Sequence, residues 1–202
     1  VGQPAEQGLL LLRLEQTEAV GHAVRAVYMY SGMADVARLS NDEELFRTCE
    51  KLFDNIIQKR MYITGGIGSS FFGEVFTIDY DLQNSSLMYA ESCAAMGFVR
   101  FASRMLNATG DGKYAEIIEK AIFNGVLSGI SLSGDKFFYT NYLEVDDNTK
   151  IYNHGAKERQ KWFTCSCCPT SFCRFLPETL QYIWSTSDDE LRLNIPVANN
   201  YK

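Results

Sequence analysis

The residues with the clearest capacity for chemistry are cysteines. The chain has six of them against only two histidines, and four fall within one nine-residue stretch, namely Cys165, Cys167, Cys168 and Cys173. Adjacent cysteines and cysteines in a Cys-x-Cys spacing are poorly placed to form disulfides with each other. A chain of 202 residues is also large enough to fold without disulfide bonds. Cysteines packed this densely more often hold a metal or do redox chemistry.

A second segment completes a possible metal shell. Glu91-Ser92-Cys93 precedes an apolar helical pattern, as the cysteine stretch does, and helix N-termini favour deprotonated thiols. Glu91 and Cys93 can supply two ligands, and two of the three clustered cysteines, Cys165, Cys167 and Cys168, can complete a tetrahedral zinc site. The alternative is a set of buried, inert thiols, which is the favoured interpretation for Cys49 and Cys173.

Glu74 is a candidate general acid. It lies in Phe71-Phe72-Gly73-Glu74-Val75-Phe76, and bulky apolar neighbours predict a raised carboxyl pKa. The alternative is a loop glutamate that points to solvent. His22, among small apolar residues, and Tyr139, on an expected strand, are by themselves more typical of packing. Gly65, Gly66 and Gly68 are not followed by the Gly-Lys-Ser/Thr that a phosphate-binding loop needs.

The elements that must position these side chains are mainly helical. Apolar periodicity predicts helices over residues 17–39, from an Asn41 cap to Arg60, over 89–106 and over 114–126, with a fifth from Pro169 to Trp184. A long glycine- and serine-rich loop is expected at 61–88, two short strands at 129–142 and a strand at 191–197. Helical hairpins of this length fit an α/α toroid around a central cleft.

Composition excludes several partner classes. The chain is 46% apolar with a net charge of −6 and has no run of Lys or Arg, which argues against nucleic acid and anionic membranes as partners. It has no apolar stretch of membrane-spanning length, and its first residues show no secretory signal, so we expect a soluble protein of open localisation.

The sequence resembles glycoside hydrolase family 127, the β-L-arabinofuranosidases. The shared motifs run in order from about residue 15 to 185. They are 15–26, 28–35, Tyr62-Ile63-Thr64-Gly65-Gly66-Ile67-Gly68-Ser69, Gly73-Glu74-x-Phe76, Tyr80-Asp81-Leu82, Tyr89-Ala90-Glu91-Ser92-Cys93-Ala94, Phe123-Asn124-Gly125 and Trp162-Phe163-x-Cys165-x-Cys167-Cys168-Pro169.

The resemblance implies a mainly α fold, the second half of an (α/α)6 barrel, with short strands and the start of a C-terminal β-sandwich. On that basis 1–14 is a poorly matching lead segment, 15–186 the partial barrel and 187–202 the start of a β-domain. Half a barrel leaves apolar helix faces uncovered, so we expect the remainder of the barrel, or another copy, to be needed, and this segment alone to hydrolyse weakly or not at all.

The resemblance also implies roles for individual residues. Zinc would be held by Glu91, Cys93, Cys167 and Cys168, with Cys167 as the nucleophile of a retaining mechanism and Glu74 as the general acid/base. His22, Tyr139 and Glu91 would contact the sugar, while Cys49, Cys165 and Cys173 receive no role.

The expected activity is release of terminal L-arabinofuranose from an arabinofuranoside-containing carbohydrate. Two alternatives belong to other classes: a non-catalytic helical domain with a structural zinc, and a sugar-binding fragment without turnover.

Overall fold

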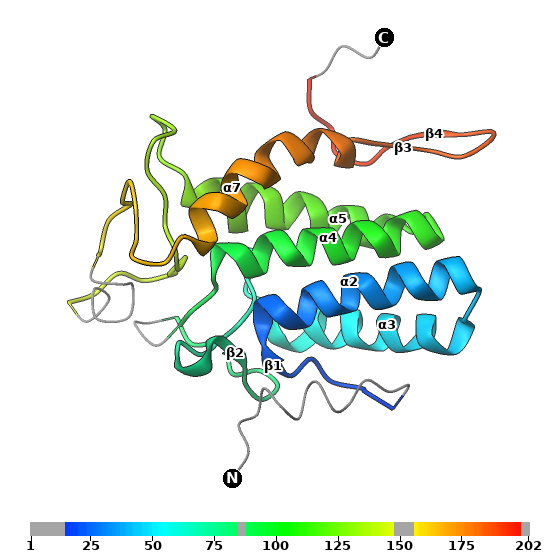
Figure 1. Cartoon of the computed structure of the whole chain (residues 1–202), viewed down its shortest axis with the longest axis horizontal. Helices are drawn as coiled ribbons and strands as arrows, with labels where there is room; N and C mark the ends of the chain where they lie inside the picture. The colour runs from blue at the N-terminus through cyan, green and yellow to red at the C-terminus, as the bar shows by residue number, and fades with distance from the viewer. Residues whose placement is uncertain (1–14, 85–87, 148–155, 199–202) are drawn as a thin grey trace.

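The protein was analysed as a computed structural model that describes residues 15–84, 88–147 and 156–198. It is mainly helical (Figure 1). The α-helices are α2 (Ala23–Ser40), α3 (Glu43–Asn55), α4 (Ser92–Thr109), α5 (Gly112–Lys120) and α7 (Cys167–Glu178). The expected lead segment 1–14 and the end of the expected β-domain lie outside the described residues.

Two adjacent residues form the turn of the first helical hairpin, one ending α2 and the other beginning α3. Asn41 ends α2 in the left-handed conformation, at φ 56°, which asparagine tolerates well. Asp42 begins α3, since its carboxylate accepts a hydrogen bond from the Leu45 amide. The prediction that Asn41 caps the second helix is therefore wrong by one residue, whereas the end at Arg60 is confirmed, because a π-helical turn (Ile56–Arg60) extends α3.

The second hairpin repeats this construction. Gly110, at φ 68°, ends α4, and Asp111 caps α5 by accepting a hydrogen bond from the Lys113 amide. A π-helical turn (Ala121–Val126) and a 3-10 turn (Leu127–Gly129) extend α5. The helices expected at 89–106 and 114–126 are thus present with shifted ends.

Three helices lie side by side and begin at the same end of the molecule. In Figure 1, α4 lies between α2 and α7, while α3 packs on α2 and α5 packs on α4. Small residues allow the close approach, because a Cβ on Gly97 of α4 would come within 2.7 Å of the Val27 side chain on α2. The space between α4 and the helices α3 and α5 is filled by the buried rings of Phe53, Phe98, Phe101 and Tyr114.

The strands are short and differ from the prediction. β1 (Gly21–His22) pairs with β2 (Val75–Phe76), and β3 (Trp184–Thr186) pairs with β4 (Leu191–Leu193), both antiparallel. The strand pair expected at 129–142 is reduced to one bridge, between Ile130 and Phe137, and the segment's other bridges join Phe137 to Gln160 and Thr140 to Glu91. The strand expected at 191–197 ends at Leu193.

Pairing with β2 also explains why α2 begins at Ala23 rather than at residue 17, since Gly21 and His22 are extended. The fifth helix begins two residues before Pro169 and ends at Glu178, followed by a 3-10 turn (Thr179–Tyr182). No helix in the described ranges has the length and apolar character needed to cross a membrane.

Candidate metal centre and active site

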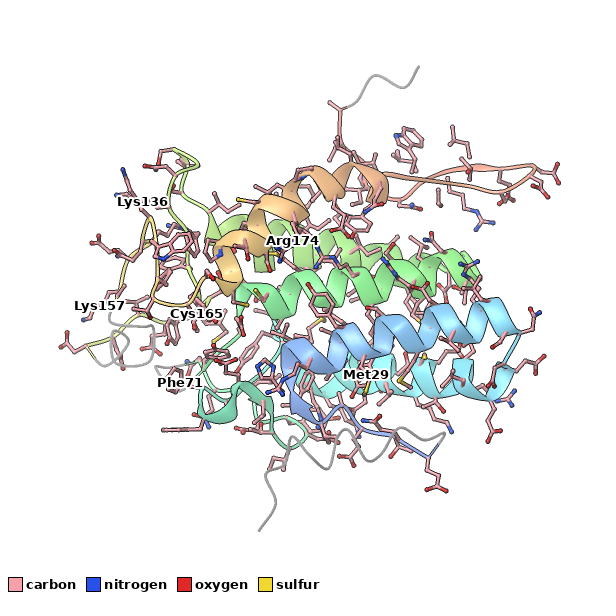
Figure 2. The ribbon with its side chains drawn as sticks, in the orientation of Figure 1. Met29, Phe71, Lys136, Lys157, Cys165 and Arg174 are labelled. Atoms are coloured by element: carbon pink, nitrogen blue, oxygen red, sulfur yellow. The ribbon has the colours of Figure 1, made fainter. Side chains whose placement is uncertain are left out.

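Three of the expected site residues lie at the starts of helices. His22 is the N-cap residue of α2, Glu91 is the N-cap residue of α4, and Cys167 is the first residue of α7. The positive ends of these helix dipoles therefore converge on the site, where they stabilise anionic side chains. Figure 2 shows Cys165 and Phe71 at this same loop-bearing end of the helices.

The caps of these helices differ from those of the outer helices. Asp42 and Asp111 cap α3 and α5 with their carboxylates. Within the described part of the chain, none of the three N-caps at the site makes a side-chain capping hydrogen bond. Two of these N-cap side chains reach into the site instead, since His22 contacts Glu74 and Glu91 contacts Cys167 and Cys168.

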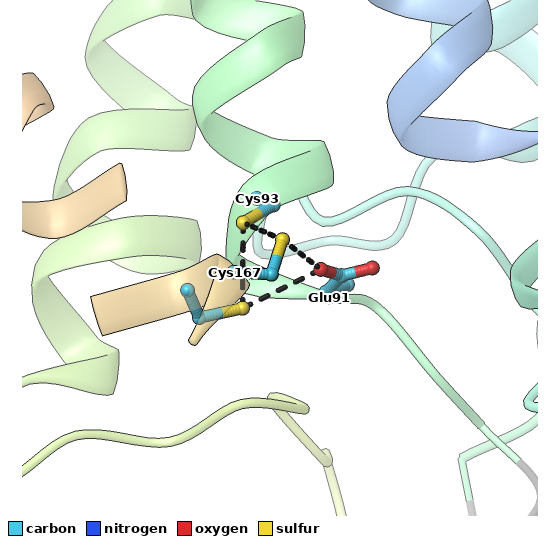
Figure 3. A group of neighbouring side chains, drawn as sticks. Glu91, Cys93 and Cys167 are labelled. Carbon is cyan, nitrogen blue, oxygen red and sulfur yellow. Dashed lines mark hydrogen bonds between the residues drawn. The ribbon is translucent and has the colours of Figure 1, made fainter. Parts of the chain in front are cut away.

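The structure brings Glu91, Cys93, Cys167 and Cys168 together, as expected (Figure 3). Their ligand atoms all lie within 4.8 Å of one another. The Cys93 sulfur is 3.0 Å from that of Cys167 and 3.4 Å from that of Cys168. The Glu91 Oε1 atom is 3.5 Å from the Cys167 sulfur and 3.4 Å from the Cys168 sulfur. Four donors from two distant segments therefore surround one point.

This donor set fits a divalent metal such as zinc. A tetrahedral site with zinc–sulfur bonds near 2.3 Å has sulfur–sulfur edges of about 3.8 Å, so the sulfurs need to separate by less than about 1 Å. The second carboxylate oxygen, Glu91 Oε2, is buried and has no hydrogen-bond partner among the described residues. A buried carboxylate in this state is costly unless a cation compensates it.

The ionisable groups of the cluster respond to burial and to one another. Burial raises the pKa of Glu91 to about 8, with smaller contributions from the charges of Cys167 and Glu74. Hydrogen bonds from Cys168 and Cys93 hold the pKa of Cys167 far below its usual range. Burial raises the pKa of Cys168. Cys167 is therefore the thiol of the cluster that most readily carries the negative charge.

Glu74 is paired rather than free in solvent. Its Oε2 atom lies 2.7 Å from Nε2 of His22, and the register of β1 with β2 places His22 opposite Val75, the next residue. The His22 hydrogen bond lowers the pKa of Glu74, partial burial opposes it, and the Tyr89 hydroxyl lowers it further. The expectation of a raised pKa is wrong, because the donors outweigh the apolar surroundings.

The loop around Glu74 has an unusual backbone. Gly73 and Glu74 adopt positive φ angles of 75° and 55°. The turn is closed by Ser70 and Val75, whose amides and carbonyls bond to each other at 3.2 Å. Left-handed backbone at a non-glycine residue is uncommon and concentrates at functional sites. Here it turns the Glu74 carboxyl toward His22.

Aromatic rings form the neighbouring wall. Tyr89 contacts both Phe71 and Tyr139, with ring centroids 5.7 and 6.4 Å apart, and Tyr139 contacts Phe163. The Tyr139 hydroxyl lies 3.5 Å from the sulfur of Cys165. Tyr139 thus lies beside the cluster, and its ring packs against aromatic neighbours. Sequence reasoning assigned no role to Tyr89, although it opens the shared motif Tyr89-Ala90-Glu91-Ser92-Cys93-Ala94.

The remaining cysteines differ in environment. All six are free thiols, and all lie within the described ranges. Cys49 is fully buried, and burial raises its pKa to about 12, as expected of an inert core thiol. Cys173 is exposed, so the expectation that it is buried is wrong. Cys165 is exposed at the edge of the cluster.

A paired carboxyl and a thiol–carboxylate cluster thus gather at one end of a helical domain. Residues 6–180 match the family model described as "Beta-L-arabinofuranosidase, GH127 catalytic domain". The chain therefore belongs to glycoside hydrolase family 127.

Individual relatives agree with this assignment. The chain is 42% identical over 178 residues to a non-reducing end β-L-arabinofuranosidase of Bifidobacterium longum, an alignment that covers 86% of this chain and 27% of that protein. A crystal structure of a GH127 β-L-arabinofuranosidase from Geobacillus stearothermophilus T6 superposes with a TM-score of 0.85 at 46% identity, covering 91% of this chain and 29% of that one. A solved GH127 β-arabinofuranosidase gives 0.82 at 43% identity, covering 90% and 27%. The chain thus spans little more than a quarter of the length of these relatives.

Proposed function

We propose that the protein to which this chain belongs is a retaining glycoside hydrolase that releases terminal L-arabinofuranose. The observation that carries the proposal is geometric: the Glu74 carboxyl, paired with His22, lies close enough to the thiol–carboxylate cluster for the charge of Cys167 to affect its pKa. Retaining glycosidases need a nucleophile and an acid/base close together. Here a thiolate takes the place of the usual second carboxylate.

The first chemical step uses both groups. The Cys167 sulfur attacks the anomeric carbon and forms a carbon–sulfur bond while the glycosidic carbon–oxygen bond breaks. Glu74 gives its proton to the departing oxygen. Since Glu74 is mainly ionised at neutral pH in the free protein, bound sugar must raise its pKa, either by excluding water or by weakening the His22 hydrogen bond.

The second step reverses the roles. Glu74 removes a proton from water, the water oxygen bonds to the anomeric carbon, and the carbon–sulfur bond breaks to regenerate the thiolate. Two inversions at one carbon give net retention. Zinc held by Glu91, Cys93, Cys167 and Cys168 would keep the Cys167 sulfur deprotonated and make it a better leaving group. His22, beside Glu74, and Tyr139, whose carbonyl oxygen lies 4.0 Å from the Cys168 sulfur, would line the sugar pocket, and Glu91 is a further candidate for sugar contact.

We also propose that this segment works within a larger (α/α)6 barrel, followed by a β-domain. Exposed apolar side chains on the two flanking helices of the α2–α4–α7 row support this proposal. They are Val36 and Leu39 on α2, and Leu176 and Leu180 near the end of α7. Remaining chain, or a second copy, would cover these faces. The 202-residue chain alone is then expected to hydrolyse an aryl arabinofuranoside poorly, and clear turnover would contradict the proposal.

The decisive experiment is covalent labelling of the complete gene product. An electrophilic arabinofuranosyl inactivator should add one mass equivalent that peptide mapping places on Cys167, alongside about one zinc per chain by elemental analysis. Cys167→Ser should abolish the label, whereas Cys173→Ser, which removes an exposed thiol away from the cluster, should retain it. Glu74→Gln should slow hydrolysis by about 10²-fold or more.

Other outcomes separate the alternatives. Zinc without labelling, and no effect of Glu74→Gln on hydrolysis of any glycoside, would indicate a structural metal domain. Arabinose binding without labelling would indicate a sugar-binding protein that has lost turnover. Either result contradicts the proposed mechanism.

A further inference from the structure

The residue before the carboxylate of the metal cluster has a strained backbone. Ala90 is 1% exposed and adopts φ 44°. This left-handed conformation is unfavourable for a non-glycine residue. It persists only where surrounding contacts impose it. Those contacts therefore decide where the next residue, Glu91, directs its carboxylate.

One side of Ala90 is held by the glycine-rich loop. The Ala90 amide donates a hydrogen bond of 2.8 Å to the carbonyl of Gly68. The Ala90 methyl also packs on Gly66, where an added Cβ would come within 3.2 Å of it. The Gly65-Gly66-Ile67-Gly68 loop lacks the rest of a phosphate-binding motif. It instead supports the backbone of Ala90 beside the metal cluster.

The other side is held by Asn141. Its backbone amide and its side-chain Nδ2 both donate to the carbonyl of Ala90, at 3.2 Å each. The same Nδ2 donates to the hydroxyl of Ser92 at 2.9 Å. A single amide side chain therefore joins the residues on both sides of Glu91.

Ser92 is fixed from the same segment. Its amide donates to the carbonyl of Tyr139 at 2.9 Å, and its hydroxyl donates to the carbonyl of Phe138 at 2.8 Å. Because the Ser92 hydroxyl gives its proton to Phe138, its oxygen accepts from Asn141. The Ser92 hydroxyl thus both donates and accepts within this network, which flanks Glu91, the N-cap residue of α4.

We propose that Asn141 is a positioning residue of the metal centre. It holds the Ala90 carbonyl and the Ser92 hydroxyl so that the Glu91 carboxylate stays aimed at the sulfurs of Cys167 and Cys168. Asn141 itself is not a ligand, and it acts through the backbone on either side of Glu91. The proposal rests on the metal binding put forward under the proposed function.

The test is a titration of the metal-free protein with Co²⁺, followed by visible absorption and by competition with Zn²⁺. Wild type should bind one Co²⁺ per chain with the intense bands of a tetrahedral thiolate site. Asn141→Asp keeps the size of the side chain but removes its donor, so affinity should fall about 10-fold or more, the usual effect of losing a group that orients a ligand. The bands should weaken as the carboxylate leaves the ion.

Asn124→Asp is the matched control. Asn124 is exposed, and its Nδ2 bonds only to the carbonyl of Lys120 in its own helical turn among the described residues. The same chemical change should therefore leave Co²⁺ affinity and spectrum at wild-type values. Asn141→Ala, which keeps the backbone bond to Ala90 and adds no charge, should give an intermediate loss and covers the case in which Asn141→Asp fails to fold.

The outcomes are distinct. Wild-type Co²⁺ affinity and spectrum in both Asn141 variants would overturn the positioning role, even if the metal-free variants melt at a lower temperature, since that result describes a purely structural residue. Failure of the wild type itself to bind Co²⁺ would overturn the metal centre and, with it, the role of Asn141.

Discussion

The Nε2 atom of His22 lies 2.7 Å from the Oε2 atom of Glu74, and this contact joins the start of α2 to the loop that carries the carboxyl. The other ring nitrogen of His22, Nδ1, is buried and has no hydrogen-bond partner in the described part of the chain. The ring therefore has one polar contact of consequence, and that contact acts on Glu74.

Removing this donor should raise the pKa of Glu74. We expect His22→Ala to shift the Glu74 titration upward, since the largest influence that lowers its pKa is lost. A ¹³C NMR titration of the labelled side-chain carboxyl measures the shift. His22→Gln, which retains a donating amide, should shift it less. An unchanged midpoint in His22→Ala would show that the contact does not control the carboxyl.

Metal binding should stabilise the fold as well as the site. At a free zinc concentration 100 times the Kd, the unfolding free energy should rise by about 2.7 kcal/mol. Melting with zinc and with a chelator measures the difference. Cys93→Ser should abolish most of it, whereas Cys173→Ser should keep it. Equal melting temperatures with and without zinc in the wild type would contradict a metal held by these residues.

Two glycines should respond in opposite directions to a single added methyl group. Gly65 has φ 81°, and a Cβ there would lie 2.8 Å from the backbone of Ala121, so Gly65→Ala should destabilise the protein by at least about 2 kcal/mol. Gly32 lies exposed in the middle of α2 with nothing within 4 Å of such a Cβ, so Gly32→Ala should stabilise it by about 0.5–1 kcal/mol. Denaturant unfolding measures both. Similar effects at the two positions would refute the close packing of Gly65.

Acid stability should depend on Asp79. Hydrogen bonds from Lys59 and Arg60 lower its pKa from 3.8 to about 2. Between these values the unfolded chain binds a proton that the folded chain does not, so Asp79 stabilises the fold above pH 3.8 and loses this effect as the pH falls toward 2. Asp79→Asn should melt below wild type at pH 6, and the gap should shrink toward pH 2. A gap independent of pH would exclude this linkage.

The sequence predicts the helical bodies well because their periodicity is local. It mistakes the start of α2, since Gly21 and His22 pair with Val75 and Phe76, which lie far away in the chain. The strands expected at 129–142 form only in part. Ile130 pairs with Phe137 across the expected turn, but Phe137 also pairs with Gln160 and Thr140 pairs with Glu91, so the segment divides its backbone groups between itself and other loops.

The candidate site, like the fold, is predictable from the sequence where the signal is local and not where it depends on tertiary contacts. Residue type and spacing are enough to nominate Glu91, Cys93 and two of the three clustered cysteines, because few chemistries require several thiols beside a carboxylate. The choice of Cys167 and Cys168 over Cys165 comes from the family resemblance. The His22–Glu74 pair and the support of Ala90 by Asn141 are tertiary contacts with no local pattern. The lowered pKa of Glu74 follows from that pairing, and the apolar residues around it in sequence point the opposite way.

The common starting edge of α2, α4 and α7 has a practical consequence for handling the protein. Helices α2 and α4 each have 18 residues, so at 1.5 Å per residue their opposite ends lie about 27 Å from the site. The β3–β4 hairpin extends at that far end (Figure 1), with Arg192 against Gly110. A fluorophore attached to the hairpin of this 202-residue chain therefore lies far from the thiol–carboxylate cluster and leaves that edge unmodified.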